Sequence, residues 1–262
     1  MTVQDFIEKK SRGEAISMVT SYDSWSAALV ARSAVDCILV GDSVAMTLHG
    51  HSSTLPVDTP AMALHTAAVR RGAPEAFVVA DMAFLSYRGS IDATLDAVGA
   101  LMRAGANAVK LEGASGNLET VARIVESGVP VMGHLGLTPQ SVNAFGGFRV
   151  QARSPEAAAR LKADALALQD AGCFSIVLEA VPAAVAEETS RALAIPAIGI
   201  GAGAGTDGQV LVLQDLLGLT ADFRPKFVRR FLEGAELVVG ALDAYHAAVA
   251  DRSFPAEAET YS

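Results

Sequence analysis

Carboxylates stand at the ends of three short apolar runs of the sequence. Asp42 ends DCILVGD, Asp81 lies near the end of AFVVADM, and Glu112 lies near the end of NAVKLEG. Three carboxylates brought together without a cation would repel one another and take up protons. Mg²⁺ prefers such oxygen ligands and completes its shell with water or substrate oxygens. We therefore predict a Mg²⁺ site made by Asp42, Asp81 and Glu112.

Two further polar side chains stand in similar places, Lys110 in NAVKLEG and His134 in VPVMGHL. Residues two apart in a strand share a face, so Lys110 is expected beside Glu112. Two roles stay open for Lys110, an ion pair with Glu112 and a clamp for a substrate carboxylate. The clamp is favoured because an acidic chain needs a local cation to bind an anion. For His134 we expect a neutral hydrogen-bond donor in the substrate site.

Glu179 stands apart from the three acids, in the apolar setting IVLEAV. Such surroundings raise the pKa of a carboxyl group, which suits a general base, although a buried glutamate paired with a loop cation stays an alternative. A metal held by acids, a nearby cation and a separate base fit a 2-oxo acid substrate. Glu179 would remove the proton at C3, and the Mg²⁺ would stabilise the enolate, which then attacks a carbon electrophile.

The elements that must position these residues alternate along the chain. Eight apolar runs read as strands, at 16–20, 36–42, 76–82, 107–113, 129–135, 174–180, 196–202 and 210–216. Amphipathic segments separate most of them, such as 154–172, where Ser154 is the expected N-cap and Pro155 the first helical residue. Repeated βα units predict parallel strands, and eight units favour a closed (β/α)8 TIM barrel. The acids then share its mouth, because the loops after parallel strands converge there.

Two segments depart from this rhythm. Residues 202–209 are too short and glycine-rich for a helix, whereas 225–250 read as one long closing helix. No linker or change of composition divides the chain, so residues 1–262 are predicted to form a single barrel domain. His49 and His51 lie in a loop too polar to interpret, and His65 and His246 lie on predicted helices, so none of the four is assigned any chemistry.

Net charge and cysteine content narrow the class of protein further. The formal charge of −9 argues against nucleic acid or an anionic membrane as a partner, because neither attracts an acidic surface. The N-terminal MTVQDFIEKK lacks the apolar core of a signal peptide, and no run reaches transmembrane length. Cys37 and Cys173 lie in apolar runs, as expected for reduced core thiols. We predict a cytoplasmic protein.

The sequence resembles the ketopantoate hydroxymethyltransferase family over nearly its whole length. The resemblance is carried by ILVGDSVAM (38–46), VVADM (78–82), AVKLEG (108–113), PVMGHLGLTPQSVN (130–143), VLEAVP (177–182) and IGIGAG (198–203). GHLGLTPQSVN and VKLEG are highly specific for it. The sequence differs from the family pattern at His51 and in the tail AEAETYS. Neither difference involves the three predicted Mg²⁺ ligands.

The resemblance implies a barrel of the phosphoenolpyruvate/pyruvate superfamily and a defined reaction. A hydroxymethyl group would pass from 5,10-methylenetetrahydrofolate to 3-methyl-2-oxobutanoate, giving 2-dehydropantoate for pantothenate and coenzyme A synthesis. It also implies a homo-oligomer, typically a decamer. By position, Asp42, Asp81 and Glu112 match the family's Mg²⁺ acids and Glu179 its proton acceptor. The substrate contacts match Asp42, Ser43, Asp81 and Lys110.

Two other readings stay open. The first is a Mg²⁺-dependent 2-oxo acid lyase or mutase of the same superfamily. Such lyases generally need a cysteine or another acid on a mobile loop, and neither Cys37 nor Cys173 is placed for that. The second is a non-catalytic metabolite-binding barrel. The loss of Glu179 or of a metal-site acid would favour it, and none of these residues is lost.

Overall fold

The computed structural model describes residues 1–220 and 225–261 of the chain. Backbone contacts divide it into two compact units, Met1–Val212 and Leu213–Ser262. The expectation of one domain over residues 1–262 stays a prediction.

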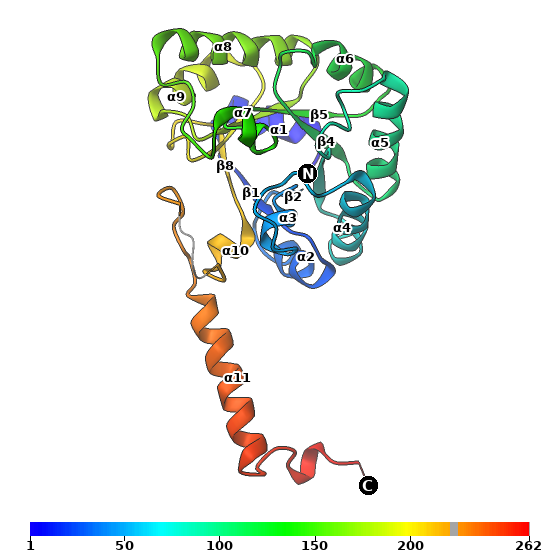
Figure 1. Cartoon of the computed structure of the whole chain (residues 1–262), viewed down its shortest axis with the longest axis vertical. Helices are drawn as coiled ribbons and strands as arrows, with labels where there is room; N and C mark the ends of the chain where they lie inside the picture. Colours follow the sequence, from blue (N-terminus) through cyan, green and yellow to red (C-terminus); the bar gives the residue numbers. More distant parts are fainter. Residues whose placement is uncertain (221–224, 262) are drawn as a thin grey trace. The chain divides into compact units, whose positions relative to one another are not determined.

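The first unit is a closed barrel of eight parallel strands in chain order (Figure 1). The strands are β1 (Ile16–Thr20), β2 (Cys37–Val40), β3 (Phe77–Asp81), β4 (Ala108–Glu112), β5 (Val131–Gly136), β6 (Ser175–Glu179), β7 (Ala197–Ile200) and β8 (Gly208–Leu211). β8 pairs with β1 in parallel and closes the ring. The predicted (β/α)8 barrel is therefore confirmed.

Helices cover the outside of the barrel and connect its strands (Figure 1). They are α1 (Val3–Arg12), α2 (Ser24–Ala31), α3 (Val44–Thr47), α4 (Thr59–Gly72), α5 (Ile91–Arg103), α6 (Leu118–Glu126), the 3₁₀ turn η1 (Pro139–Ser141), α7 (Val142–Phe145), α8 (Pro155–Asp170) and α9 (Ala183–Ala192). Local chemistry sets several starts: the side chains of Asp23, Asp58, Ser90 and Ser154 each accept an amide of the first turn. Ser154 is thus the N-cap that the sequence predicts.

All eight predicted strand ranges overlap the observed strands, but the eighth shares only residues 210 and 211 with β8, so most of it was placed wrongly. β8 starts at Gly208, before the predicted 210–216, and Leu213–Leu216 forms the short helix α10. Gly208 has no side chain, so a search for apolar runs does not detect it as part of a strand. A Cβ at this position would overlap the carbonyl oxygen of Ile16 on β1, so the close packing of β8 on β1 requires glycine. As expected, no helix joins β7 to β8.

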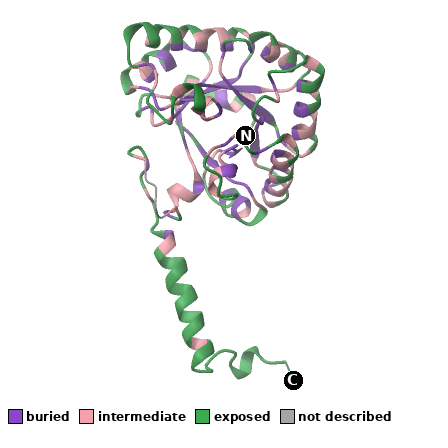
Figure 2. Cartoon of the chain, viewed as in Figure 1, coloured by how far each residue is buried: buried purple, intermediate pink, exposed green. Residues whose placement is uncertain are grey.

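The strands form the buried centre of the unit, shown in purple in Figure 2. Phe6 of α1 is fully buried and packs against Phe77 at the start of β3 and Phe174 just before β6, with ring centroids 5.3 and 5.2 Å away. Lys10 of the same helix pairs with Asp207, which precedes β8. α1 therefore covers the end of the barrel where the strands begin. The opposite end carries the residues singled out by the sequence.

The second unit contains α10 (Leu213–Leu216), α11 (Gly234–Ala250) and the 3₁₀ turn η2 (Glu257–Glu259). A helix was predicted over 225–250, a range that the structure describes in full. The observed helix begins only at Gly234, so the first part of the prediction was wrong. The amides of Phe231 and Gly234 donate to the carbonyls of Leu216 and Leu217, which takes them out of any helical ladder. None of the helices within residues 1–220 and 225–261 has the length and hydropathy needed to cross a membrane.

Candidate active site

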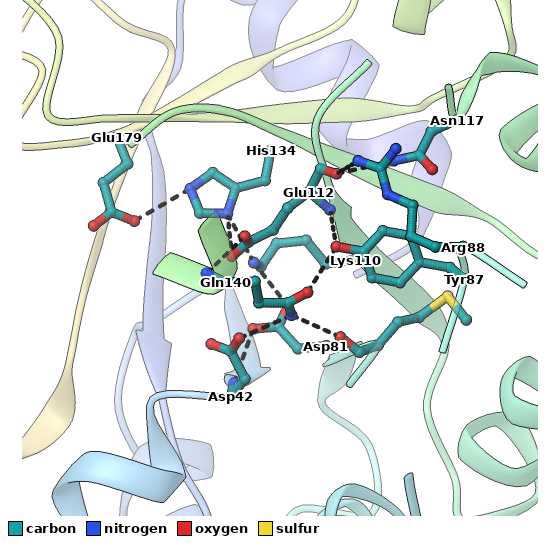
Figure 3. A network of polar contacts seen from close by, with 11 residues as sticks. Asp42, Asp81, Tyr87, Arg88, Lys110, Glu112, Asn117, His134, Gln140 and Glu179 are labelled. Carbon is teal, nitrogen blue, oxygen red and sulfur yellow. Dashed lines mark hydrogen bonds and ion pairs between the residues drawn. The ribbon is translucent and has the colours of Figure 1, made fainter. Parts of the chain in front are cut away.

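Side chains from the ends of β3, β4, β5 and β6 meet at one mouth of the barrel with Asp42, which follows β2 (Figure 3). Strand register brings them together, because Asp81 pairs with Lys110 and Glu112 with His134. The backbone amide of Asp42 donates to Asp81 Oδ2 over 2.9 Å. The sequence-based grouping of Asp42, Asp81, Lys110, Glu112 and His134 is thus present in the structure.

Lys110 makes its ion pair with Asp81, with 2.8 Å between Nζ and Oδ1, and both side chains are buried. Glu112, the partner suggested by the sequence, makes no ion pair with Lys110, although the Glu112 charge affects the pKa of Lys110. Burial lowers the pKa of the Lys110 ammonium, but the charges of Asp81, Glu112 and Asp42 together raise it above its ordinary value. Lys110 therefore stays charged and is the cation of the site.

Asp42 shows how much negative charge gathers here. Burial, followed by the charges of Asp81 and Glu112, raises the pKa of the Asp42 carboxyl to about 8. Lys110 and a hydrogen bond from Gln140 act in the opposite direction without cancelling the rise. A carboxyl group in this position gains from a further cation beside it.

Gln140 of η1 connects two of the acids and was not assigned a role from the sequence. Its side-chain amide donates to Asp42 Oδ2 and to the carbonyl of Met82, both over 2.9 Å, and its backbone amide donates to Glu112 Oε2 over 3.0 Å. The hydroxyl of Tyr87 donates to Gln140 Oε1 over 2.7 Å. Gln140 lies within the family motif GHLGLTPQSVN, which was the available signal.

His134 lies between the acids and the expected base (Figure 3). Its Nδ1 is 3.4 Å from Glu112 Oε1 and 3.2 Å from Lys110 Nζ, and its Nε2 is 3.2 Å from Glu179 Oε2. Burial and the Lys110 charge lower the pKa of this imidazole, but the contacts with Glu112 and Glu179 outweigh them and raise it to about 9. The two carboxylates thus favour the charged ring, whereas the Lys110 ammonium beside Nδ1 favours a ring nitrogen that accepts. The neutral hydrogen-bond donor expected from the sequence stays a prediction.

Glu179 and Ser43 border this buried set and are more accessible than its members. The Glu179 side chain retains 18% of its exposure, against 3% for Glu112. Ser43 is half-buried, and its Oγ lies 2.8 Å from the hydroxyl of Tyr22. Both residues lie at the mouth, as the strand ends predict.

The acids offer oxygen ligands for a magnesium ion. Glu112 Oε1 is buried and accepts no hydrogen bond with acceptable geometry, which leaves a desolvated anionic oxygen facing the site. Within the described residues, no three His, Cys, Asp or Glu side chains are close enough to hold a metal by themselves. Mg²⁺ commonly binds through one or two carboxylates and keeps several waters, so the residues present fit it. The three-acid set stays a prediction.

Comparison with known proteins gives two kinds of likeness. The chain matches the family model of ketopantoate hydroxymethyltransferase over residues 1–257. It is 57% identical over 261 residues to the 3-methyl-2-oxobutanoate hydroxymethyltransferase of Bdellovibrio bacteriovorus, covering 100% of this chain and 99% of that one. Its identity to the protein of the same name from Coxiella burnetii is 52% over 256 residues, covering 97% and 96%.

Solved structures share the fold at much lower identity. A phosphonopyruvate hydrolase determined with oxalate and Mg²⁺ aligns with a TM-score of 0.63 at 11% identity, covering 100% of this chain and 92% of that one. A 2,3-dimethylmalate lyase of the phosphoenolpyruvate mutase/isocitrate lyase superfamily gives 0.59 at 17% identity, covering 80% and 81%. These structures bear out the barrel type. The match along the full length and the identity to named relatives show that the chain belongs to the ketopantoate hydroxymethyltransferase family.

Proposed function

We propose that the protein transfers a hydroxymethyl group from 5,10-methylenetetrahydrofolate to 3-methyl-2-oxobutanoate, giving 2-dehydropantoate. Family membership over the whole chain supports the reaction. The observation that carries it is the separation within the site. Glu179 contacts His134 and stands outside the buried set in which Asp81 pairs with Lys110. A base apart from the acids is what removal of a proton from a bound 2-oxo acid requires.

The acidic side of the mouth would hold Mg²⁺ through Asp42, Asp81 and Glu112, directly or through water. When bound, Mg²⁺ withdraws electrons from the keto carbonyl and stabilises the negative charge that develops there. Lys110 and Ser43 would hold the carboxylate and keto oxygens of the substrate. Their positions, one buried and charged and one half-buried, suit a small anion entering from the mouth.

Glu179 would take the proton from C3 of 3-methyl-2-oxobutanoate. His134 would orient this carboxylate, because its Nε2 lies 3.2 Å from Glu179 Oε2 and has no other hydrogen-bond partner, while its Nδ1 faces Glu112. The carbanion equivalent at C3 then bonds to the methylene carbon of the folate, and both C–N bonds of that carbon break. Water supplies the hydroxyl group of 2-dehydropantoate, and the two nitrogens of the released tetrahydrofolate take up the remaining proton of water and the proton held by Glu179. These reaction steps need no nucleophilic cysteine, and Cys37 and Cys173 are both buried and free.

Exchange of the C3 proton tests the base without the folate. With Mg²⁺ and 3-methyl-2-oxobutanoate in D₂O, we expect loss of the C3 proton signal by NMR. Glu179→Gln should slow exchange by roughly 10²- to 10⁴-fold, because a general base contributes about that factor. The exposed Glu188→Gln is the matched control. Undiminished exchange in Glu179→Gln would remove the assigned role.

Formation of 2-dehydropantoate in the presence of 5,10-methylenetetrahydrofolate decides between the proposed transferase and the alternatives. A lyase or mutase of the superfamily would instead cleave or rearrange its 2-oxo acid, and a metabolite-binding barrel would bind 3-methyl-2-oxobutanoate unchanged. Family membership favours the transferase.

We also propose that the protein works as a homodecamer in the cytoplasm, with neither nucleic acid nor membrane as a partner. Family resemblance supports the assembly. Free, buried Cys37 and Cys173 suit a reducing compartment, and the charge of −9 disfavours polyanionic partners.

A further inference from the structure

Two histidines to which the reaction gives no role face each other beside the mouth. His49 follows α3 and is exposed, while His65 lies on α4 and is half-buried. Their Nε2 atoms are 3.0 Å apart. This pair lies on elements adjoining Ser43, but neither ring contacts an acid of the site in the described contacts.

The orientation of His65 is fixed by the backbone. Its Nδ1 lies 2.7 Å from the carbonyl oxygen of Tyr22, and a carbonyl only accepts, so Nδ1 carries the proton. In the neutral ring the lone pair is then on Nε2, directed toward His49. A metal-binding histidine is typically held in this way, with its other ring N–H donated to a backbone carbonyl or carboxylate.

We propose that His49 and His65 form a binding site for a late first-row divalent cation, represented by Zn²⁺. Two imidazole nitrogens bound to a tetrahedral Zn²⁺ at about 2.0–2.1 Å lie roughly 3.3 Å apart, so the observed 3.0 Å needs only a small opening. Imidazole ligands select Zn²⁺, Cu²⁺ or Ni²⁺, whereas the carboxylates of the mouth suit Mg²⁺. The negative net charge favours cations in general.

The remaining positions on the ion belong to water or to His51. The His51 ring centroid lies 6.2 Å from that of His49, and its side chain is exposed and able to turn. Within the described residues no third His, Cys, Asp or Glu is already grouped with the pair. Two histidines therefore define the site, and His51 adds to it.

Binding would join two parts of the mouth. His49 lies on the segment that follows Ser43 and α3, whereas His65 holds the carbonyl of Tyr22, whose hydroxyl contacts Ser43 Oγ at 2.8 Å. A cation on both rings would fix this segment to α4. This inference does not depend on the proposed reaction.

Isothermal titration of the full-length protein with ZnCl₂, in constant excess MgCl₂, tests the site. We expect one more Zn²⁺ equivalent in the wild type than in His49→Gln, or at least about 10-fold weaker binding of that equivalent in the variant. His246→Gln, an exposed histidine on α11, is the matched control and should bind as the wild type does. His51→Ala should weaken binding less than His49→Gln.

Electron paramagnetic resonance with Cu²⁺ adds a readout independent of activity. The wild type should show coupling to two imidazole nitrogens or more, and His49→Gln should show one fewer. Identical titrations and spectra for wild type and His49→Gln would overturn the proposal. So would the absence of Zn²⁺ binding in the wild type, which would leave the pair as a hydrogen bond between neutral rings.

Discussion

Gln140 is the residue through which the acids of the mouth are held in place. It bonds Asp42 with its side chain and Glu112 with its backbone amide, while Tyr87 fixes its carbonyl oxygen. Groups that orient metal ligands matter nearly as much as the ligands, because a carboxylate free to rotate loses its preset geometry.

Replacing Gln140 by alanine should therefore lower activity without unfolding the barrel. We expect kcat/KM for 2-dehydropantoate formation to fall by roughly 10- to 100-fold and the Mg²⁺ requirement to rise. Steady-state kinetics at several Mg²⁺ concentrations measure both. Gln4→Ala, on the exposed face of α1, is the control. Equal kinetics in the two variants would show that Gln140 does not position the acids.

Burial decides the value of the Lys110–Asp81 ion pair. The exposed pair Lys162–Glu188 has the same 2.8 Å separation, so the two differ mainly in contact with solvent. Lys110→Met should cost about 3–5 kcal/mol of unfolding free energy, because it leaves Asp81 buried without its cation. Lys162→Met should cost less than about 1 kcal/mol. Urea unfolding of both variants measures the difference, and similar midpoints would contradict this account.

Most of the candidate site could be predicted from the sequence because its members end strands. Parallel strands bring their carboxyl ends to one mouth, so Asp42, Asp81, Glu112 and His134 needed only strand positions. Gln140 lies in the 3₁₀ turn η1 and Tyr87 in a loop, and in such connections the path of the chain decides which way a side chain points. The ion-pair partner of Lys110 could not be predicted either. The register between β3 and β4 places Lys110 beside Asp81, and residue spacing within one strand does not reveal that register.

At the scale of elements, the close approach of β5 and β6 holds Glu179 in position. Gly136 at the end of β5 has φ +90°, and a Cβ there would overlap the Glu179 carbonyl oxygen and the Val181 side chain. The next amide, Leu137 N–H, donates to the same oxygen over 2.8 Å. Only glycine allows this packing.

Gly136→Ala should disturb both stability and catalysis, and Gly128→Ala separates the two causes. Gly128 has a similar φ of +86° but open space around it, so it should lose only about 1–2 kcal/mol for the left-handed backbone. Gly136→Ala should lose more, and its kcat should fall because Glu179 moves. Thermal unfolding and kinetics of the pair test this. Matching losses in both variants would rule out a role for the β5–β6 contact.

The fold was predictable at element scale wherever apolar runs and helix caps were distinct. Ser154 at the start of α8 is one such case. Errors arose where glycine carries the strand, as at Gly208 in β8, and where backbone bonds override helix propensity, as at Phe231. Neither effect leaves a mark in hydrophobic periodicity.

At the scale of the whole molecule, α11 presents apolar side chains to solvent in the single chain. Val238, Leu242, Tyr245 and Val249 follow helical spacing along one face, and each is about half exposed. Contiguous apolar surface of this kind is typical of protein–protein contacts. This agrees with the proposed assembly.

A decamer of 27.0 kDa chains should have a mass of about 270 kDa by light scattering. Leu242→Glu should shift the mass to smaller species while circular dichroism keeps the barrel signal, because a charge in an interface is costly to bury. Glu236→Gln, a polar change on the same helix, should leave the mass unchanged. A wild type that is monomeric at micromolar concentration would refute the assembly.

The helix α1, which precedes β1, determines the end of the barrel at which ligands can enter. Phe6 packs against Phe77 and Phe174, so these aromatic rings close the end of the barrel where the strands begin. In the proposed reaction, substrates would therefore enter at the opposite end of the barrel, past Ser43 and Glu179. An inhibitor that spans this end would then compete with both proposed substrates at once.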